Sequence, residues 1–257
     1  MLTVCAITGS ASGIGAAIRR RLEADGARVI GVDLRAAEVI ADLSSAAGRA
    51  GAVAGILERC SGGGLDRLVI SAGVGTHVRP PSLVAAVNYF GAIDLLDGLL
   101  PALRGGSDPA ALVVCSNSAQ MAPLDDHPYV RALLAHDEPE ARRVVDAGDS
   151  SIVAYLGAKH ALGRAVRRRA GAWGRAGVRL NAVAPGPVKT PLLAADMADP
   201  VTGAAIGKLS IPLGRMGEPE EIAELAAFLL HPKASWIHGA IYYIDGGNDA
   251  EFRPDRF

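Results

Sequence analysis

Tyr155 and Lys159, in the string Tyr155-Leu156-Gly157-Ala158-Lys159, are the residues whose types and spacing point most directly to chemistry. On a helix, side chains four residues apart lie on one face, about one turn from each other. A phenol is a weak acid near neutrality because its unperturbed pKa is about 10, and a nearby ammonium lowers that pKa by favouring the phenolate. The pair could therefore act as a general acid and base on a hydroxyl proton. The same spacing also occurs on solvated helix faces, so the pair gains weight only from the residues around it.

A glycine-rich string near the N-terminus, Thr8-Gly9-Ser10-Ala11-Ser12-Gly13-Ile14-Gly15, joins an apolar run to a helical pattern. Gly9 allows a tight turn, Gly13 lets the backbone approach a pyrophosphate, and Gly15 lets the helix pack closely on the strand. The helix N-terminus adds N–H donors and a positive dipole end for the anion. The string predicts a dinucleotide-binding loop, and the alternative is a tight turn without a ligand.

Asp33 ends the second strand pattern, where an acidic residue can accept a hydrogen bond from a ribose 2′-hydroxyl. A 2′-phosphate would be repelled there, and the glycine loop carries no basic residue that would reverse the preference. Arg35 is near enough to leave NADP open as the alternative. The sequence predicts NAD as the cofactor, unless Asp33 only caps a turn or a helix.

Four further positions could serve the same site. Asp42-Leu43 follows a short strand-like run and could hold an adenine ring, or could cap the next helix. Ser71-Ala72-Gly73 ends a strand with small residues that would admit a cofactor, or forms an ordinary turn. Asn88 lies inside a helical pattern, where Asn is disfavoured, and could hold a water or kink the helix, or be a surface amide. Ser116 ends a strand and could donate a hydrogen bond to a substrate oxygen, or be a cap.

Apolar strand patterns alternate with helical patterns along the whole chain, which predicts a parallel sheet covered on both faces. We expect an α/β fold, a single-domain Rossmann-type doubly wound parallel sheet flanked by helices, over residues 1–257, with ligands beyond the carboxyl ends of the strands. The expected strands are Leu2–Thr8, Arg28–Asp33, Arg67–Ser71, Ala111–Ser116, Val178–Ala184 and Ala240–Asp245. The main expected helices are Ile14–Asp25, Leu83–Leu103, Ile152–Ala176 and Pro219–Leu230.

Two segments interrupt this alternation. The first is an insertion at about 117–151, charged in its second half and partly helical in pattern, and so long a connection is usually functional or a small subdomain. The second, at about 187–210, is a candidate substrate lid that would exclude water. With Val74–Pro81, these segments are expected to shape the substrate pocket. Four apolar residues at helical spacing would form the inner surface of the lid. The alternative is that they pack into the hydrophobic core as the buried face of a helix: Leu192, Leu193, Met197 and Ile206.

Composition narrows the class of protein. The chain has 257 residues, of which 50% are hydrophobic and 4% aromatic, and a net charge of −1. This suits one large globular domain and gives no electrostatic reason to expect nucleic acid or an anionic membrane as a partner. Cys5, Cys60 and Cys115 form neither a disulfide framework nor a zinc pattern, so we expect buried free thiols, a reducing cytoplasm and no metal. The apolar run Met1–Thr8 is too short to span a bilayer and lacks the basic flank of a targeting segment.

In their order along the chain, these motifs resemble those of the short-chain dehydrogenases/reductases. Pro185-Gly186-Pro187-Val188-Lys189-Thr190 and Asp245-Gly246-Gly247 extend the resemblance, which covers Leu2 to about Gly247. One departure is Ser71, which stands where the family usually has Asn. A closer resemblance, to the bacterial 3α-hydroxysteroid dehydrogenase/carbonyl reductase group, rests on the insertion and on these strings: Gly31-Val32-Asp33-Leu34-Arg35, Glu38-Val39-Ile40-Ala41-Asp42-Leu43-Ser44, Val87-Asn88-Tyr89-Phe90-Gly91-Ala92, Ala172-Trp173-Gly174 and Arg253-Pro254…Phe257.

The resemblance implies a role for each catalytic position. Tyr155 would be the general acid in reduction and the base in oxidation, and Lys159 would lower its pKa and bind the nicotinamide ribose. Ser116 would hold and polarise the carbonyl, and Asn88 would anchor a water in a proton relay. The cofactor would be held by Gly9, Ser12, Gly13, Ile14, Gly15, Asp33, Asp42, Leu43, Ala72, Gly73, Tyr155, Lys159, Pro185, Gly186, Val188 and Thr190. Within that set, Val188 would bond the carboxamide through its backbone and Thr190 would contact the carboxamide or phosphate end.

The expected activity is the NAD-dependent interconversion of a secondary alcohol and a ketone, on 3α-hydroxysteroids or other bulky carbonyl compounds. One alternative is the same chemistry on aromatic or aliphatic alcohols, and another is a catalytically silent nucleotide-sensing scaffold. The polar string Asn117-Ser118-Ala119-Gln120 offers Asn117 or Gln120 as extra substrate contacts. The resemblance also implies a homodimer or homotetramer. The insertion adjoins the helix Ile152–Ala176, where it could obstruct a subunit contact and favour a dimer through the C-terminal elements.

Overall fold

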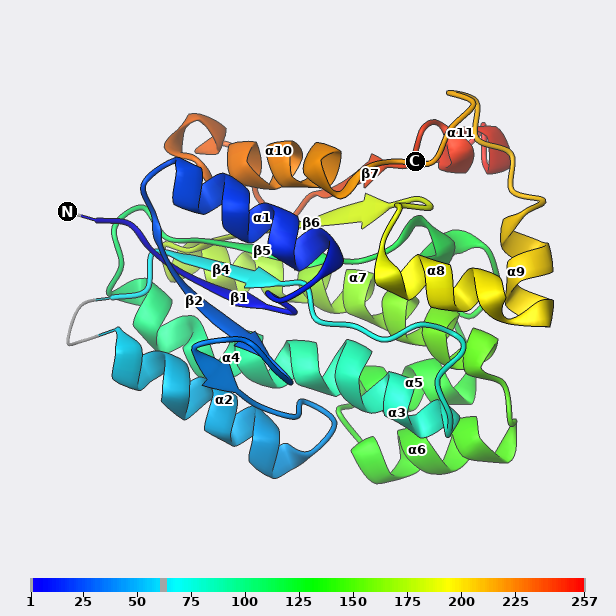
Figure 1. Cartoon of the computed structure of the whole chain (residues 1–257). Helices are drawn as coiled ribbons and strands as arrows, with labels where there is room; N and C mark the ends of the chain where they lie inside the picture. Colours follow the sequence, from blue (N-terminus) through cyan, green and yellow to red (C-terminus); the bar gives the residue numbers. More distant parts are fainter. Residues whose placement is uncertain (1, 61–63, 257) are drawn as a thin grey trace.

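The centre of this computed structural model is a seven-stranded parallel sheet with the order β3-β2-β1-β4-β5-β6-β7 (Figure 1). Its strands are β1 (Val4–Thr8), β2 (Arg28–Asp33), β3 (Val39–Ile40), β4 (Arg67–Ile70), β5 (Ala110–Val114), β6 (Arg179–Pro185) and β7 (Ile241–Ile244). Each expected strand is present, with ends that shift by at most two residues. The structure describes residues 2–60 and 64–256, so Met1 and Phe257, at the ends of the expected domain, lie outside the described residues.

The strand order reverses between β1 and β4, which is the point where a doubly wound sheet opens a crevice for ligands. The chain runs outward from β1 through β2 to β3, then returns beside β1 as β4 and continues to β7 on the other side. Thr8 and Ile70 pair at the carboxyl ends of these neighbouring strands. The predicted fold class is therefore confirmed, and the reversal falls next to the glycine loop.

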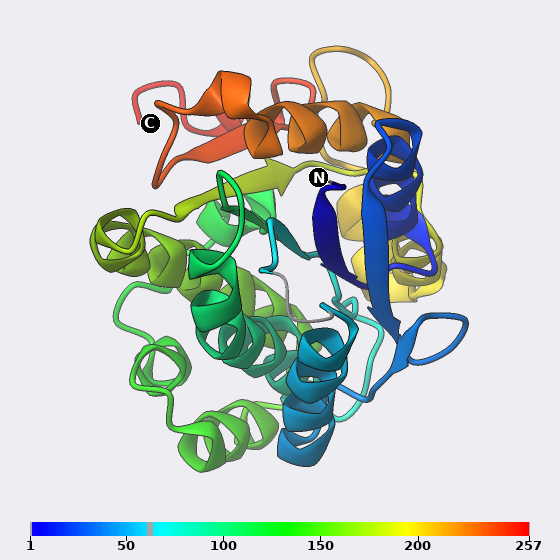
Figure 2. The ribbon, with the colours of Figure 1, turned by 90° about the vertical axis from the view of Figure 1, so that its left-hand side faces the viewer.

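Helices cover both faces of the sheet (Figures 1 and 2). One face packs against α2 (Ala46–Arg59), α4 (Ala92–Arg104) and α7 (Ser151–Arg175), and the other against α1 (Gly13–Ala24) and α10 (Pro219–Leu230). Strand side chains alternate between the two cores: on β1, Ala6 joins the first, while Cys5 and Ile7 join the second. The two apolar layers cover both faces of the sheet, so a ligand can reach the sheet only at the ends of its strands.

The long helix expected over Leu83–Leu103 consists of three segments. These are α3 (Pro81–Ala85), the π-helical segment η1 (Ala86–Gly91) and α4. Among the described residues, the stretch Pro81–Arg104 is long and apolar enough to cross a bilayer by length and composition, but 67% of its apolar window is buried inside the protein. That burial is what the core helix of this fold requires.

The insertion contains the 3₁₀ turn η2 (Asn117–Gln120), α5 (Pro128–Leu134) and α6 (Glu138–Ala147), so its partly helical pattern is confirmed. The rest of the chain forms α8 (Pro191–Ala198), α9 (Pro200–Ile206), η3 (Pro232–Ala234) and α11 (Asn248–Phe252). In Figure 1, α8 and α9 stand beyond the carboxyl ends of the strands, while α5 and α6 lie below them beside α3.

A buried guanidinium holds the insertion to the body of the domain. Arg49, on α2, is 3% exposed and forms ion pairs with Asp94 on α4 and with Glu138 at the start of α6. Arg142 pairs with the same Glu138 and donates to the carbonyl of Ser44. A charge buried this deeply is tolerated only when it is paired and hydrogen-bonded. The charged string of the insertion is therefore a docking element and not a solvated loop.

We predict that Glu138→Gln lowers the free energy of unfolding by about 2 kcal/mol, because it leaves buried Arg49 with one charged partner in place of two. Urea denaturation followed by far-UV circular dichroism measures the effect. Glu140→Gln is the matched control, since Glu140 lies on the same helix but pairs with exposed Arg143, and exposed pairs contribute about 0–1 kcal/mol. Equal losses in the two variants would contradict this role for Glu138.

Candidate active site

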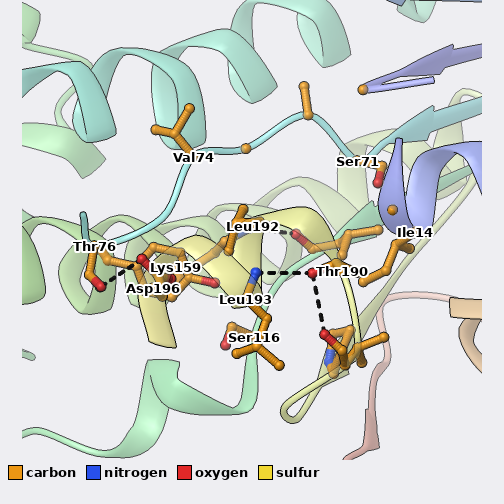
Figure 3. A pocket seen from close by; sticks show the side chains of 18 of the residues that line it. Ile14, Ser71, Val74, Thr76, Ser116, Lys159, Thr190, Leu192, Leu193 and Asp196 are labelled. Carbon is orange, nitrogen blue, oxygen red and sulfur yellow. Dashed lines mark hydrogen bonds between the residues drawn. The ribbon is translucent and has the colours of Figure 1, made fainter. Parts of the chain in front are cut away.

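A cleft of about 470 Å³ opens at the carboxyl edge of the sheet, between the glycine loop, α7 and the α8–α9 segment. Figure 3 shows part of its lining, with residues as far apart in the sequence as Ile14 and Asp196. Every position predicted for the cofactor lines it: Gly9, Ser12, Gly13, Ile14, Gly15, Asp33, Asp42, Leu43, Ala72, Gly73, Tyr155, Lys159, Pro185, Gly186, Val188 and Thr190. Ser116 also lines it, whereas Asn88 stands behind the wall. The fold thus gathers residues that are far apart in the sequence.

Two hydroxyl groups and one amine lie close together at the inner end of the cleft. Tyr155 and Lys159 lie on α7, one turn apart, and Ser116 follows β5. The Lys159 ammonium lies 5.9 Å from the centroid of the Tyr155 ring and donates to the carbonyl of Val114 at 2.9 Å. Ser116 also accepts from the N–H of Ser118 at 3.2 Å, so it caps η2 while it faces the cleft. The arrangement can hold and protonate one oxygen atom of a ligand.

Burial dominates the acid–base properties of this group. It raises the pKa of Tyr155 to about 12, with the Ser116 hydroxyl offsetting part of the rise and the charge of Asp196 adding to it. Burial also lowers the pKa of Lys159, because a charged ammonium is poorly solvated there. The expectation that Lys159 brings the pKa of Tyr155 below its usual value is therefore wrong for the protein alone.

Asn88 is a buried structural amide, not the surface amide left open by the sequence. It is 1% exposed within the π-helical segment η1. Its Oδ1 accepts from the N–H of Val74 at 2.8 Å, and its Nδ2 donates to the carbonyl of the same residue at 2.9 Å. A β-carbon at Gly73 would lie 3.3 Å from Asn88 Oδ1 and 3.8 Å from Lys159 Nζ. Asn88 therefore fixes the loop after β4 and stands near Lys159, with Gly73 between the two side chains.

The glycine loop keeps its backbone open toward the cleft. Gly9 and Gly13 have positive φ angles of 68° and 52°, which favour glycine. A β-carbon at Gly9 would lie 2.8 Å from the backbone of Ala72, and one at Gly13 would lie 3.2 Å from the methyl group of Thr190. Ser12 stands at the N-cap of α1, and its side chain makes no capping bond. Both the α1 N-terminus and this hydroxyl remain available to an anion.

Asp33 and Asp42 lie at the other end of the cleft, and each also accepts hydrogen bonds that hold the local backbone. Asp33 accepts from the N–H groups of Ala11 at 3.0 Å and Leu34 at 2.7 Å, so it does cap a turn, and it also lines the cleft beside the glycine loop. The Asp42 carboxylate accepts from the N–H of Ser44. The alternative that Asp42 caps the next helix is wrong, because Ser45 caps α2.

The segment after β6 supplies backbone groups that fit a nicotinamide. Among the described residues, none accepts a hydrogen bond from the N–H of Val188, which lines the cleft, while its carbonyl accepts from the Thr190 hydroxyl at 3.3 Å. Thr190 also caps α8 by accepting from Leu193. With the open glycine loop, the acidic residue that ends β2 and an unpaired N–H here, the residues fit a bound dinucleotide along the whole cleft.

At the substrate end of the cleft, the structure differs from the predictions for the lid and for the insertion. Leu192, Leu193 and Ile206 line it from two short helices, but Met197 is 44% exposed and is not part of the lining. None of the four belongs to either hydrophobic core, so the core-stripe alternative is also wrong. Of the insertion, only Asn117, Ser118 and Met121 line the cleft. The helices α5 and α6 do not line the cleft, and α6 is tied to α2 by the ion pair between Arg49 and Glu138.

The two amides proposed as extra substrate contacts differ in position, because Asn117 lines the cleft and Gln120 does not. Asn117 is 4% exposed and donates to the side chains of Asn248 and Asp245, which joins η2 to the C-terminal turn. Gln120 does not line the cleft and faces a separate hollow beside Arg253. The amide of Asn117 therefore serves the packing of the chain while the residue lines the cleft.

Asp196 is a site residue that the sequence analysis missed. It lies on α8, 5% exposed, and lines the cleft together with Thr76 and Thr202 (Figure 3). A signal existed, since Asp196 is the acidic residue within the otherwise apolar pattern Leu192–Met197.

Sequence and structure comparisons agree with this geometry. Residues 141–249 match a family model described as enoyl-(acyl carrier protein) reductase. The chain is 49% identical over 258 residues to 3-alpha-hydroxysteroid dehydrogenase/carbonyl reductase of Comamonas testosteroni, with 100% of both chains covered. It belongs to the short-chain dehydrogenase/reductase family. A second relative in this family, cis-4-hydroxycyclohexanecarboxylate dehydrogenase of Sinomonas cyclohexanicum, is 30% identical with 96% of each chain covered.

A solved structure gives the same result for the fold. The 3-alpha-hydroxysteroid dehydrogenase of Pseudomonas sp. B-0831, determined in complex with NADH, superposes with a TM-score of 0.97 at 49% identity, covering 99% of this chain and 100% of that one. The predicted family and the closer resemblance are confirmed by these similarities.

Of the three cysteines, Cys115 lines the cleft. Cys5, Cys60 and Cys115 are buried free thiols, and burial raises the pKa of Cys115, next to Ser116, to about 11. A thiol is reactive as its thiolate, so a redox role for Cys115 is disfavoured. In the described part of the chain, no three His, Cys, Asp or Glu side chains are grouped to hold a metal.

We predict that in the cofactor-free protein Tyr155 ionises only well above pH 10, because burial raises its pKa to about 12. Alkaline titration of tyrosinate absorbance, compared between the wild type and Tyr155→Phe, isolates this group. The two curves should coincide through pH 10 and separate at higher pH, with circular dichroism confirming that the fold persists. A tyrosinate signal at neutral pH that disappears in the variant would contradict this prediction.

Proposed function

We propose that this chain is an NAD-dependent dehydrogenase/reductase that interconverts a secondary alcohol and a ketone, with 3α-hydroxysteroids or other bulky carbonyl compounds as substrates. The observation that carries the proposal is the meeting of Ser116, Tyr155 and Lys159 in the cleft that the glycine loop opens. The full-length similarity to 3-alpha-hydroxysteroid dehydrogenase/carbonyl reductase supports the substrate class. The apolar side chains of the α8–α9 segment suit a bulky apolar ring system.

The proton steps follow from the inner end of the cleft. In reduction, the carbonyl oxygen of the substrate lies between Ser116 and Tyr155, where Ser116 donates a hydrogen bond and Tyr155 transfers its proton. A Tyr155 pKa of about 12 keeps the phenol protonated near neutrality, which suits the acid role. In oxidation Tyr155 must accept the proton, so deprotonation at higher pH favours this direction. When bound, the dinucleotide supplies or accepts the hydride.

Lys159 and Asn88 support the proton transfer by Tyr155. The Lys159 ammonium stabilises the phenolate of Tyr155 whenever it forms and binds the hydroxyls of the nicotinamide ribose. Asn88 holds the loop that places Gly73 beside that ammonium, and a water anchored at this position would return protons to Lys159. At the other end, Asp33 accepts from the ribose 2′-hydroxyl and repels a 2′-phosphate, which favours NAD over NADP.

The same chemistry on aromatic or aliphatic alcohols is the second candidate. One relative in the family is a cis-4-hydroxycyclohexanecarboxylate dehydrogenase, whose named substrate has a single ring. A silent nucleotide-sensing scaffold is less consistent with the site, because a sensor needs no hydroxyl pair beside a buried lysine.

We propose that the chain forms a homodimer in the cytoplasm, through α10 and β7. The strand β7 lies at the edge of the sheet, and Phe228 and Trp236 near it are 47% and 98% exposed. Exposed apolar groups beside an open strand edge suit a subunit contact. Light scattering tests this, and a tetrameric mass would count against it. The three buried free thiols suit a reducing compartment.

We predict that Tyr155→Phe lowers kcat by at least about 10²-fold, because it removes the transferable proton and keeps the ring. NADH binding, followed by fluorescence titration, should remain measurable because the glycine loop and Asp33 are unchanged. Tyr242→Phe on β7, outside the cleft, is the matched control and should keep wild-type turnover. A Tyr155→Phe enzyme with near-normal rates would show that the proposed mechanism is wrong.

A further inference from the structure

Asp196 places a negative charge in the wall of an apolar substrate pocket. Its carboxylate is 5% exposed on α8, the helix that also contributes Leu192 and Leu193 to the lining. A buried carboxylate is costly unless hydrogen bonds or charges compensate it. Its presence in the cleft therefore needs a physical reason.

One oxygen of this carboxylate ties the pocket walls together. Asp196 Oδ1 accepts from the Thr76 hydroxyl at 2.9 Å, from the His77 N–H at 3.0 Å and from His77 Nδ1 at 2.8 Å. A carboxylate can only accept hydrogen bonds, so the Thr76 hydroxyl donates its single proton to Asp196. The Thr76 oxygen therefore accepts a hydrogen bond from the Thr202 hydroxyl at 3.0 Å. The network joins α8 and α9 to the loop after β4, as the dashed bond between Thr76 and Asp196 shows (Figure 3).

The other oxygen is left without a protein donor. Among the described residues, none donates a hydrogen bond to Asp196 Oδ2, and this atom keeps accessible surface beside the cleft. Gly75 makes the geometry possible, because a β-carbon there would lie 2.5 Å from both carboxylate oxygens. The charge of Asp196 also raises the pKa of Tyr155, so the two groups act within one cavity.

We propose that Asp196 is a specificity-determining residue whose Oδ2 accepts a hydrogen bond from a substrate hydroxyl remote from the reacting carbon. The inference rests on the proposed function, since it names the substrate class within that chemistry. A carboxylate cannot donate to a ketone, and it repels a substrate carboxylate. The enzyme therefore prefers an alcohol with a second hydroxyl over the analogue with a ketone at that position.

Asp196→Asn provides a sharp test because the network dictates how the amide lies. Oδ1 must keep accepting from Thr76 and His77, so the NH₂ group replaces Oδ2 and presents a donor to the substrate. The lid contacts survive, while the recognition of the remote group reverses. Asp199→Asn is the matched control, since Asp199 caps α9 outside the cleft through the N–H groups of Val201 and Thr202, and Asn is an equally good cap.

The experiment measures kcat/KM with NAD for matched pairs of 3α-hydroxysteroids that carry either a hydroxyl or a ketone on ring C or on ring D. We expect the wild type and Asp199→Asn to favour the hydroxyl member of at least one pair by about tenfold or more. Asp196→Asn should bring that ratio to one or invert it, while turnover of the ketone member is kept or rises.

Each other outcome overturns a defined part of the account. Wild-type ratios near one for every pair would overturn the inference without any need for a folded variant. Equal losses on both members in Asp196→Asn, with the ratio unchanged, would also overturn it, because they would mean that Asp196 only holds the lid. Absence of turnover of every steroid by the wild type, with NADH still bound, would overturn the proposed function and this inference with it.

Discussion

The buried ammonium of Lys159 is the constraint around which the site is organised. It is 5% exposed, and its one hydrogen bond to the described residues goes to the carbonyl of Val114, at the end of β5. An ammonium has three donors, so its burial leaves hydrogen-bonding capacity that only a ligand, water or Tyr155 can satisfy. The sheet and α7 hold this charge in place, and Tyr155, Ser116 and Gly73 lie around it.

Other groups along the cleft share this incomplete pairing. The Ser12 hydroxyl makes no capping bond, the Val188 N–H has no acceptor among the described residues, and Asp196 Oδ2 has no donor among them. Proteins tolerate such local deficits where they serve a ligand, and compensate for them elsewhere. Here the compensation includes two continuous apolar cores and the paired Arg49 that fixes the insertion. These unpaired groups are the positions at which we expect hydrogen bonds to a bound ligand.

Local patterns were enough to predict the sheet, the glycine loop and the positions that line the cleft. Each strand pattern is a short apolar run that ends in a turn, and the strand ends of a parallel sheet share one edge. The Tyr155 and Lys159 pair was predictable for the same reason, because helical spacing depends only on neighbours in sequence.

What the sequence did not reveal depends on contacts between distant segments. The pKa of Tyr155 follows from burial by several elements at once, so a helix pattern alone suggested the wrong direction. The sequence does not show that the Asn117 side chain also donates to Asn248, because only the fold brings these two residues together. Asp196 acquires its partners from the loop after β4, more than a hundred residues earlier in the chain. Likewise, the sequence does not show that the charged part of the insertion pairs with Arg49, which lies about ninety residues earlier in the chain.

The central claim is that this cleft oxidises a secondary alcohol at the 3α position with NAD. The most direct test follows the absorbance of NADH with purified protein, NAD and a 3α-hydroxysteroid, with its 3β epimer and an aromatic alcohol in parallel and NADP in place of NAD. The account predicts NADH formation from the 3α epimer with NAD and little from the other combinations. Turnover of the 3β epimer or of the aromatic alcohol alone, or strict dependence on NADP, would contradict it.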